Sequence, residues 1–329
     1  MKLAIVILNW NGQQLLENFL PSVVNYADGQ DLYVIDNGST DTSVLFLKQH
    51  YPTIQCIKLA HNFGYVGGYN EGLKHINADV FCLLNSDIEV TKNWLKPIIN
   101  TFENNINTAI IQPKILDYHH KNKFEYAGAG GGFMDQLGYP YCRGRIFHTL
   151  EEDHGQYNDQ KEVFWASGAC LFIRTNVFNN LGGFDSRFFA HMEEIDLCWR
   201  AKNKGLTVAY VGNSTVYHVG GASLDVSNPK KTYLNFRNSL YTLVKNTSKP
   251  LVLVVLLRLI LDGIAGFHFL LQAKPKHTFA IIKAHGSFYL ALPYLFQFRR
   301  ENSFTKPFKL HPSIVWSYFV KNEKYFTKL

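Results

Sequence analysis

The first 115 residues alternate between short apolar runs and amphipathic segments. Apolar runs of strand length lie at 3–8, 32–35, 54–59, 80–84 and 109–113. Segments with helical spacing lie between them, at 13–26, 42–50, 68–76 and 92–103. Strands that alternate with helices predict an α/β domain with a mostly parallel sheet. Because ligands bind such sheets at the carboxyl ends of the strands, the polar residues after each strand are the first candidates for function.

The pattern changes after residue 116. Residues 117–162 are polar and Gly-rich, which predicts a loop or a small subdomain. An apolar run at 163–174 then predicts one strand. The spacing further on predicts helices at 193–204 and 231–245, with short strands between them at 208–211 and 215–219.

Residues 251–273 are almost continuously apolar and long enough to cross a bilayer. Arg258 and Asp262 interrupt this run, and a charge at mid-membrane costs about 2.5–3.5 kcal/mol. Their i, i+4 spacing lets the two side chains pair on one helical face. The run therefore favours a helix that lies in the membrane interface, or a re-entrant helix, over a clean span.

A second apolar stretch, at 279–298, is flanked by Lys274, Lys276, Arg299 and Arg300. Basic residues beside amphipathic helices are typical of proteins that bind an anionic membrane surface. The pattern thus predicts a C-terminal, amphipathic and apolar helical region that associates with a membrane. The alternative is that these helices only cover the catalytic domain.

The net charge of +7 is unevenly distributed. Residues 245–329 carry 13 Lys or Arg residues and three acidic residues, whereas residues 1–244 carry 20 and 23. This distribution argues against a globally basic nucleic-acid-binding protein and for an anionic partner near the C-terminal region.

Several common catalytic and nucleotide-binding motifs are absent from the sequence. No GxxxxGK[ST] or GxSxG stretch occurs. The glycine-rich stretch GAGGGF (128–133) does not fit GxGxxG and does not follow the first strand. A P-loop, a dinucleotide site and a hydrolase nucleophile elbow are therefore not expected.

Acidic residues follow several predicted strands, at Asp36, Asp41, Asp87, Glu193, Glu194 and Asp196. With the residues around them, they resemble the family-2 glycosyltransferases of the GT-A fold, especially rhamnosyltransferase-like bacterial members. The resemblance is carried by VILNWNG (6–12), VIDNGSTD (34–41), NFGYVGGYNEG (62–72), LLNSDIEV (83–90), WASGACLFIRTNVFNNLGGFD (165–185), HMEEIDLCWRAKNKG (191–205), VYHVGGAS (216–223) and FRNSLYTLVKN (236–246). It implies a catalytic domain at 1–246, with a nucleotide-binding half at 1–115 and an acceptor half at 116–246. Residues 247–329 would form the basic, apolar helical tail.

The resemblance implies a nucleotide-sugar site at the ends of the first strands. Asp36 would accept a hydrogen bond from the N3–H of uracil or thymine, or from a ribose hydroxyl, with Asn9 and Asn11 beside it. A glycine-rich turn before a helix would bring backbone N–H groups to phosphate or ribose. Its residues are Asn62, Gly64, Gly67, Gly68 and Asn70. A turn and helix start without ligand contact is the structural alternative for these glycines.

The triplet Asn85-Ser86-Asp87 stands where the family usually has Asp-x-Asp, so the first position departs from the pattern. Asp87 would bind a divalent metal, Mn²⁺ or Mg²⁺, while Asn85 and Ser86 would border the nucleotide sugar. His218, which precedes Gly220-Gly221, would be a second ligand, because a neutral imidazole binds Mn²⁺ well. Oxygens of the donor diphosphate and water would complete the coordination.

Glu193 and Glu194 open a predicted helix, where its dipole favours carboxylates whatever their function. The family pattern is Glu-Asp, with the catalytic base at the second position, so the resemblance assigns that role to Glu194. Glu193 would contact the acceptor, together with Trp165, Ser167 and Gly168.

The resemblance implies an inverting, metal-dependent glycosyltransferase whose donor is a dTDP- or UDP-sugar, with dTDP-L-rhamnose as the leading candidate. The acceptor would be a lipid-linked or surface glycan, at the cytoplasmic face of the inner or plasma membrane. Two alternatives are a sugar-1-phosphate nucleotidyltransferase and a non-catalytic, membrane-bound nucleotide-sugar-binding protein. The first has a Gly-rich, Arg-containing loop after strand one, where this chain has NWNGQQ.

Overall fold

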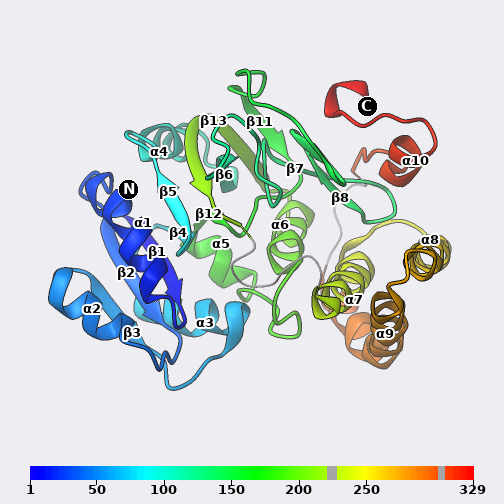
Figure 1. Ribbon diagram of the computed structural model, residues 1–329, viewed down its shortest axis with the longest axis horizontal. Coiled ribbons are helices and arrows are strands. Elements are labelled where there is room, and N and C mark those ends of the chain that lie inside the picture. The colour runs from blue at the N-terminus through cyan, green and yellow to red at the C-terminus, as the bar shows by residue number, and fades with distance from the viewer. Residues whose placement is uncertain (221–227, 303–307) are drawn as a thin grey trace.

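A computed structural model describes residues 1–220, 228–302 and 308–329. Its centre is a nine-stranded sheet of order β11-β13-β6-β12-β4-β1-β2-β3, with β5 paired to β13 (Figure 1). The strands are β1 (Leu3–Asn9), β2 (Asp31–Asp36), β3 (Gln55–Lys58), β4 (Val80–Asn85), β5 (Ile88–Val90), β6 (Thr108–Asp117), β11 (Gln160–Val163), β12 (Cys170–Arg174) and β13 (Thr207–His218). The strands β4-β1-β2-β3 are parallel, as predicted, whereas β12 runs antiparallel to β4 and β6. The α/β fold is thus confirmed, on a mixed sheet.

Both faces of the sheet are buried. Leu3, Ile5 and Ile7 of β1 point into one apolar core, while Ala4 and Val6 point into the other. This period of two places a core on each side, so helices cover both faces. They are α1 (Gln13–Asn25), α2 (Ser43–His50), α3 (Gly64–Gly72), the 3₁₀ turn η1 (Leu73–His75), α4 (Leu95–Asn104), α5 (Thr175–Asn180) and α6 (Glu193–Asn203).

The structure divides one predicted strand into two and joins two other predicted strands into one. The run 163–174 is divided into β11, which pairs with the edge of β13, and β12, which pairs with β4 and β6. Between them the chain bridges to Gly132 through Trp165. The segments 208–211 and 215–219 belong to one strand, β13, whose register against β6 shifts between Val211 and Thr215. Apolar runs alone do not reveal a change of partner or a bulge.

The polar segment 117–162 contains a small antiparallel sheet, so it is a subdomain and not a simple loop. Its order is β10-β9-β8-β7, with β7 (Gly132–Met134), β8 (Pro140–Cys142), β9 (Arg145–Ile146) and β10 (Thr149–Leu150). The end of the chain returns to this sheet through α10 (Ile314–Phe319) and η2 (Phe326–Lys328). Ile314 packs against Tyr141 and Ile146, and its N–H donates to Asp135 Oδ2 over 2.9 Å.

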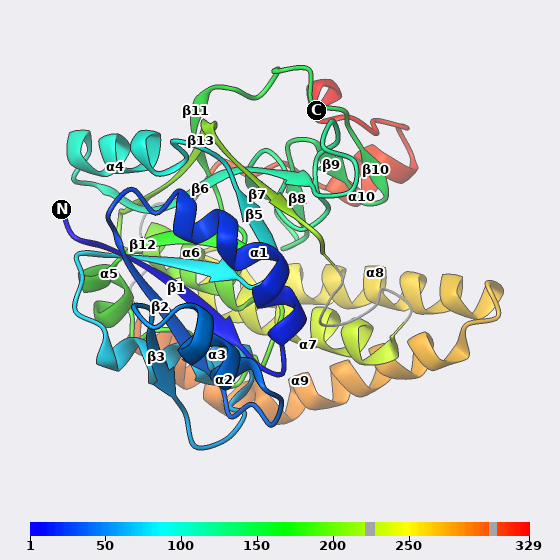
Figure 2. The ribbon, with the colours of Figure 1, turned by 60° about the vertical axis from the view of Figure 1, so that its left-hand side comes forward.

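Three long helices complete the fold: α7 (Pro229–Asn246), α8 (Leu251–Leu271) and α9 (Pro275–Glu301). Helices α8 and α9 form a hairpin that extends away from the nine-stranded sheet (Figure 2). Both are long and apolar enough to cross a membrane by length and composition alone. Only 22% of the apolar window of α8 and 33% of that of α9 are buried.

The predicted pairing of Arg258 and Asp262 is confirmed, with 2.7 Å between Arg258 Nε and Asp262 Oδ1. The pair faces the small sheet, because Arg258 also donates to the carbonyl of Gly138 and Asp262 accepts from the Tyr139 hydroxyl. Every fourth residue from Val254 to Gly266 is buried on this side. The opposite face of α8 is apolar and exposed, at Val252, Leu256, Ile260, Ile264, Phe267 and Leu271.

Candidate active site

The predicted metal ligands meet where β4 and β13 end. Strand β5 follows Asp87 directly and runs antiparallel to β13, with Ile88 opposite His218. This pairing brings His218 Nε2 to 3.2 Å from Asp87 Oδ1. Asn85, at the end of β4, places its amide nitrogen 3.5 Å from the same ring nitrogen. Both Asp87 and His218 are 5% exposed, so the two potential ligands lie in a protected corner.

Glu125 is a member of this cluster that the sequence did not suggest. Its Oε2 lies 3.3 Å from His218 Nδ1, on the side of the ring away from Asp87. Glu125 reaches this place because the chain returns along β6, where its N–H donates to the carbonyl of Ile115. A carboxylate behind an imidazole fixes the orientation of the ring and strengthens it as a metal ligand.

Burial alone would lower the pKa of His218, but Asp87 and Glu125 outweigh this effect and raise its pKa to about 10. Without a cation, the ring therefore carries its proton between two carboxylates. A metal ion would have to displace that proton, because only the neutral imidazole is a ligand. No group of three or more His, Cys, Asp or Glu side chains suited to a metal occurs in the described part of the chain.

The nucleotide-side residues lie at the same edge of the sheet. The register pairs Leu8 with Asn85 and Asn9 with Asp36, which lines up the ends of β4, β1 and β2. Asn9 and Asp36 are buried, and the Asn9 amide donates to Asp36 Oδ1 over 3.4 Å. Asn11 accepts hydrogen bonds from the backbone N–H groups of Thr40 and Asp41, which organises the loop after β2.

The glycine-rich stretch is part of helix α3 and not a turn before it. The helix begins at Gly64, four residues earlier than the spacing predicts, and the Gly64 N–H donates to Asn62 Oδ1 over 2.8 Å. Gly64 has a φ of +73°, a region that disfavours residues with a Cβ. A Cβ on Gly68 would lie 2.7 Å from Leu8, so close packing of α3 on β1 requires this glycine.

Three predicted ligand residues, Asn70, Trp165 and Ser167, make hydrogen bonds within the protein. Both hydrogen-bonding ends of the Asn70 amide bind the backbone of Phe184, at 2.7 and 2.9 Å. Trp165 is 2% exposed and its indole N–H donates to the carbonyl of Phe133. Ser167 is also buried, and its hydroxyl accepts from the N–H of Ala169. Ligand contacts for these residues stay predictions.

The segment 168–169 links Glu194 to the triplet Asn85-Ser86-Asp87. The N–H of Asn85 donates to the carbonyl of Ala169 over 2.9 Å. A Cβ on Gly168 would lie 3.8 Å from Glu194 Cβ. Tyr65 of α3 donates its hydroxyl hydrogen to the Gly168 carbonyl over 2.8 Å. The nucleotide half and the helix of the predicted base therefore meet at Gly168.

Both adjacent carboxylates have raised pKa values. Burial raises the pKa of Glu194 to about 7, although backbone N–H groups at the start of α6 oppose the shift. Burial and the charge of Glu194 raise the pKa of Glu193 well above its usual range. Glu193 Oε2 and Glu194 Oε2 are buried and have no hydrogen-bond partner among the described residues. The surroundings thus favour the neutral form of both carboxyl groups.

The turn before these glutamates has an unfavourable backbone. Phe189, His191 and Met192 have φ values of +67°, +67° and +72°. Each such residue costs of order 1–3 kcal/mol unless the surroundings hold it. Asn238 of α7, which is fully buried, donates its amide hydrogens to the carbonyls of Phe188, Ala190 and His191. Asn238 therefore fixes the turn from which α6 begins.

Replacing Asn238 by Ala should lower the transfer rate about 100-fold, the size of effect that a ~1 Å misplacement of a catalytic group produces. The affinity for nucleotide should be unchanged, because Asn238 holds the turn and does not face the nucleotide half. The measurement is kcat together with the nucleotide Kd, with Asn235→Ala on the same helix as the control. An Asn238→Ala enzyme that is folded and fully active would show that the turn holds without this amide.

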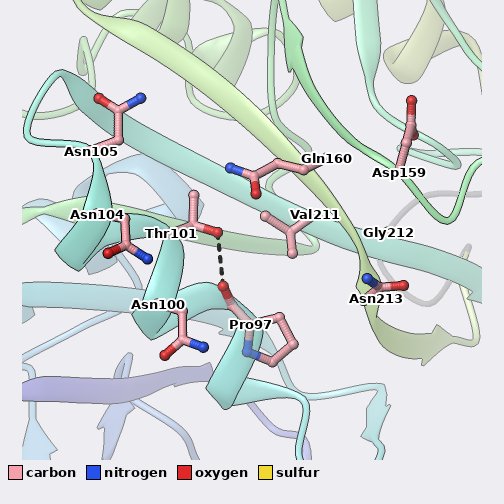
Figure 3. A pocket seen from close by; sticks show the side chains of 10 residues that line it. All are labelled: Pro97, Asn100, Thr101, Asn104, Asn105, Asp159, Gln160, Val211, Gly212 and Asn213. Carbon is pink, nitrogen blue, oxygen red and sulfur yellow. Dashed lines mark hydrogen bonds between the residues drawn. The ribbon is translucent and has the colours of Figure 1, made fainter.

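A separate polar pocket lies beside α4, β11 and β13 (Figure 3). Its lining is rich in carboxamides: Asn100, Asn104, Asn105, Gln160 and Asn213. None of the candidate site residues lines this pocket, so it takes no part in the candidate active site.

The fold is similar to solved glycosyltransferase structures. Staphylococcus aureus TarS in complex with UDP-GlcNAc matches with a TM-score of 0.57 and 14% identity, over 99% of this chain and 93% of that chain. GalNAc-T7 with UDP, GalNAc and Mn²⁺ matches with a TM-score of 0.56 and 15% identity, over 74% of this chain. The chain spans only 47% of the length of that GalNAc-T7 structure.

Curated relatives are glycosyltransferases. The low-salt glycan biosynthesis hexosyltransferase Agl10 of Haloferax volcanii is 26% identical, over 72% of this chain and 73% of that protein. The N-acetylglucosaminyl-diphospho-decaprenol L-rhamnosyltransferase of Mycobacterium tuberculosis is 25% identical, over 66% of this chain and 75% of that protein. Residues 4–182, more than half of the chain, match the model of "Glycosyl transferase family 2". The protein therefore belongs to glycosyl transferase family 2 and is a glycosyltransferase.

Proposed function

We propose that the enzyme inverts the anomeric configuration as it moves a sugar from a dTDP- or UDP-sugar to a hydroxyl of a lipid-linked or surface glycan. The observation that carries the proposal is the arrangement around Gly168 and Ala169. Glu194 lies against Gly168, and Asn85 of the metal-binding triplet is hydrogen-bonded to Ala169. A base on one side of the segment 168–169 and a diphosphate site on its other side suit a single displacement at the anomeric carbon.

In this displacement Glu194 accepts the proton of the acceptor hydroxyl, and the oxygen attacks the anomeric carbon opposite the nucleotide. A new carbon–oxygen bond forms as the bond to the diphosphate oxygen breaks, so the configuration inverts once. The diphosphate leaves with the bonding electrons, and the proton stays on Glu194 until it is exchanged with solvent. The pKa of Glu194 near 7 suits a general base at neutral pH.

Asp87 and His218 fit a divalent cation, Mn²⁺ or Mg²⁺, because a carboxylate and an imidazole face each other at 3.2 Å. Glu125 would orient the imidazole from behind. When bound there, the cation would neutralise charge on the leaving diphosphate. The Mn²⁺ in the GalNAc-T7 structure, which has a similar fold, supports this proposal.

The leading donor sugar is L-rhamnose, and the support for it is the name of the mycobacterial relative. That name also describes an acceptor joined to a polyprenol through diphosphate, which supports a lipid-linked acceptor here. A thermal-shift screen of UDP-, GDP- and dTDP-sugars with Mn²⁺ tests the donor. Stabilisation by GDP-sugars alone, or by no nucleotide sugar, would contradict the proposed donor class.

We also propose that the exposed face of α8 rests on an anionic membrane at its cytoplasmic side. The charged pair of α8 is directed at the small sheet, so the helix cannot leave the domain to span a bilayer without exposing Arg258 and Asp262. The outer stripe of α8 is apolar, and Lys274, Lys276 and Lys283 are exposed on the same hairpin. This combination favours a helix that lies in the interface.

The double variant Leu256→Glu, Ile260→Glu should reduce binding to anionic liposomes at least tenfold. Burying each of these side chains contributes about 1.5–3 kcal/mol, and the two carboxylates would add repulsion. Co-sedimentation with vesicles at low and high salt measures the effect, and salt should weaken wild-type binding in part. Leu45→Glu is a matched control, since Leu45 is 52% exposed on α2. Equal vesicle binding by wild-type protein and the double variant would contradict the proposed surface.

A further inference from the structure

Arg145, at the start of β9, is a buried cation without a carboxylate partner. Arg145 is only 8% exposed, yet no described Asp or Glu forms an ion pair with its side chain. The guanidinium makes one weak hydrogen bond, from Nη2 to Cys142 Sγ at 3.5 Å, and lies 4.5 Å from the ring centre of Tyr126. Its Nε is buried and unpaired. Arg143, on the same hairpin, differs because it is paired with Asp159 at 2.9 Å.

Buried guanidinium groups are normally paired, because an uncompensated charge is costly to remove from water. Several N–H donors of Arg145 are still available, and this planar group binds carboxylate or phosphate oxygens through two parallel hydrogen bonds. An anionic ligand would supply the missing partner. The exposed ring of Tyr126, which is 43% accessible, indicates that the guanidinium lies just below the surface.

Backbone pairing locates this cation relative to the helix of Glu194. Arg145 is opposite Cys142, Cys142 is opposite Gly132, and Gly132 is bridged to Trp165. The next residue, Ala166, donates its N–H to Cys198 Sγ of α6, one turn after Glu194, the proposed base. Arg145 also lies against Tyr126, the neighbour of Glu125, which supports the proposed metal site.

The same hairpin connects Arg145 with the helix that carries the proposed membrane surface. Tyr139 precedes β8 and donates its hydroxyl hydrogen to Asp262 of α8 over 3.0 Å, on the face of α8 opposite the exposed apolar stripe. Cys142, the last residue of β8, is opposite Arg145. At about 3.3 Å per residue, Cys142 lies about 10 Å along the chain from Tyr139. Arg145 is therefore one short strand away from α8, on the protein side of that helix.

We propose that Arg145 binds a phosphate group of a lipid-linked acceptor and so presents the attached sugar to Glu194. The proposal rests on the proposed function, because it assigns the acceptor side of that site. A lipid phosphate has its charge close to the membrane interface, and β8 leads from α8, the proposed membrane-binding helix, to Arg145. A phosphate of the donor is the other source of the same chemistry, and binding experiments distinguish the two.

The test uses the full-length protein with two probes, decyl diphosphate and UDP with Mn²⁺, in calorimetric titrations. Arg145→Gln should weaken decyl diphosphate about 10- to 100-fold, the size expected for hydrogen bonds to a charged group. The Kd of UDP with Mn²⁺ should change by less than about threefold, given that donor contacts lie elsewhere. Arg145→Lys keeps the charge but not the planar fork, so its affinity for decyl diphosphate should be intermediate.

Arg143→Lys is the matched control for disturbance of the hairpin, and decyl maltoside is the control for binding to apolar surfaces. Thermal unfolding checks that each variant is folded. Weaker UDP binding with unchanged decyl diphosphate binding would assign the phosphate to the donor and overturn the proposal. Unchanged affinity for both probes would leave Arg145 with a structural role alone, which also overturns it. Failure of the proposed donor and metal would be seen separately, as no binding of UDP with Mn²⁺ to the wild-type protein.

Discussion

Glu194→Gln should reduce sugar transfer by about 10²- to 10⁴-fold, the contribution that general base catalysis typically makes. Glutamine has nearly the same shape but cannot accept the acceptor proton. The nucleotide Kd should stay within about threefold of the wild-type value, because Glu194 reaches the nucleotide half only through Gly168. Single-turnover transfer rates and nucleotide titrations, made on folded samples of matched stability, measure the two effects.

Glu193→Gln is the matched control, one residue away on the same helix. Glu193 is the more buried of the two, and burial and the charge of Glu194 raise its pKa well above the usual range, which favours its neutral form. A neutral glutamine should therefore replace it with a smaller loss of rate. The opposite result, an inactive Glu193→Gln and an active Glu194→Gln, would move the base by one position. Activity in both variants would exclude α6 as the catalytic element.

The pH dependence of the transfer rate follows from Glu193 and Glu194. A base must be ionised, and the pKa of Glu194 is raised to about 7 by burial. The wild-type rate should therefore fall as the pH drops below about 7 and level off above it. Because Glu194 and Glu193 interact, the profile reports the pKa of the pair. A rate independent of pH between about 5 and 8 would show that a group near 7 is not the base.

Much of the fold could be predicted because the nucleotide half obeys simple rules. The strands β1, β2 and β4 contain short apolar runs, helices lie between successive strands, and parallel pairing follows from that alternation. The order of β12 and β13 could not be predicted in this way. Their partners depend on contacts distant in sequence, and the chain between β11 and β12 turns because Trp165 bridges to Gly132.

The start of α3 shows how packing changes the meaning of a residue type. Glycine is a poor helix former, and the spacing places the start of the helix at Gly68, after Gly64 and Gly67. In the folded protein, Gly68 lets α3 approach Leu8 closely, and the Asn62 side chain accepts from the first N–H of the helix. These tertiary contacts outweigh a propensity difference of about 1 kcal/mol per glycine.

The residues of the candidate site also divide into those that the sequence predicts and those that it does not. Asp87, His218 and Glu194 follow strands or open a helix, where functional side chains are expected, and the structure brings them to one edge of the sheet. Glu125 lies in a polar segment without periodicity, and only the return of the chain along β6 carries it to His218. Asn238 is on a helix of another layer, and nothing in its local sequence indicates the strained turn that it holds. Residues 221–223 of the VYHVGGAS stretch lie outside the described residues.

The second large effect is expected at Asp87. Asp87→Ala should abolish the dependence of UDP binding on Mn²⁺, because it removes the only carboxylate of the Asn85-Ser86-Asp87 triplet and leaves His218 as a lone ligand. Weak binding without metal should persist, since Asn9 and Asp36 are unaltered at the ends of β1 and β2. Titrations of UDP with and without Mn²⁺ measure the difference between the two conditions.

Two other carboxylates near His218, those of Glu125 and Asp117, predict graded effects on metal affinity. Glu125 supports His218 from behind, so Glu125→Gln should weaken Mn²⁺ about 10- to 100-fold without abolishing its effect. Asp117 ends β6 opposite His218, but its carboxylate accepts from the N–H of His120 instead, so Asp117→Ala should leave the metal dependence intact. The expected order of metal affinity is therefore wild type and Asp117→Ala, then Glu125→Gln, then Asp87→Ala. Loss of Mn²⁺ dependence in Asp117→Ala but not in Asp87→Ala would show that the metal ligand is Asp117, at the end of β6, and not Asp87. Equal Mn²⁺ dependence in all four proteins would overturn the metal site.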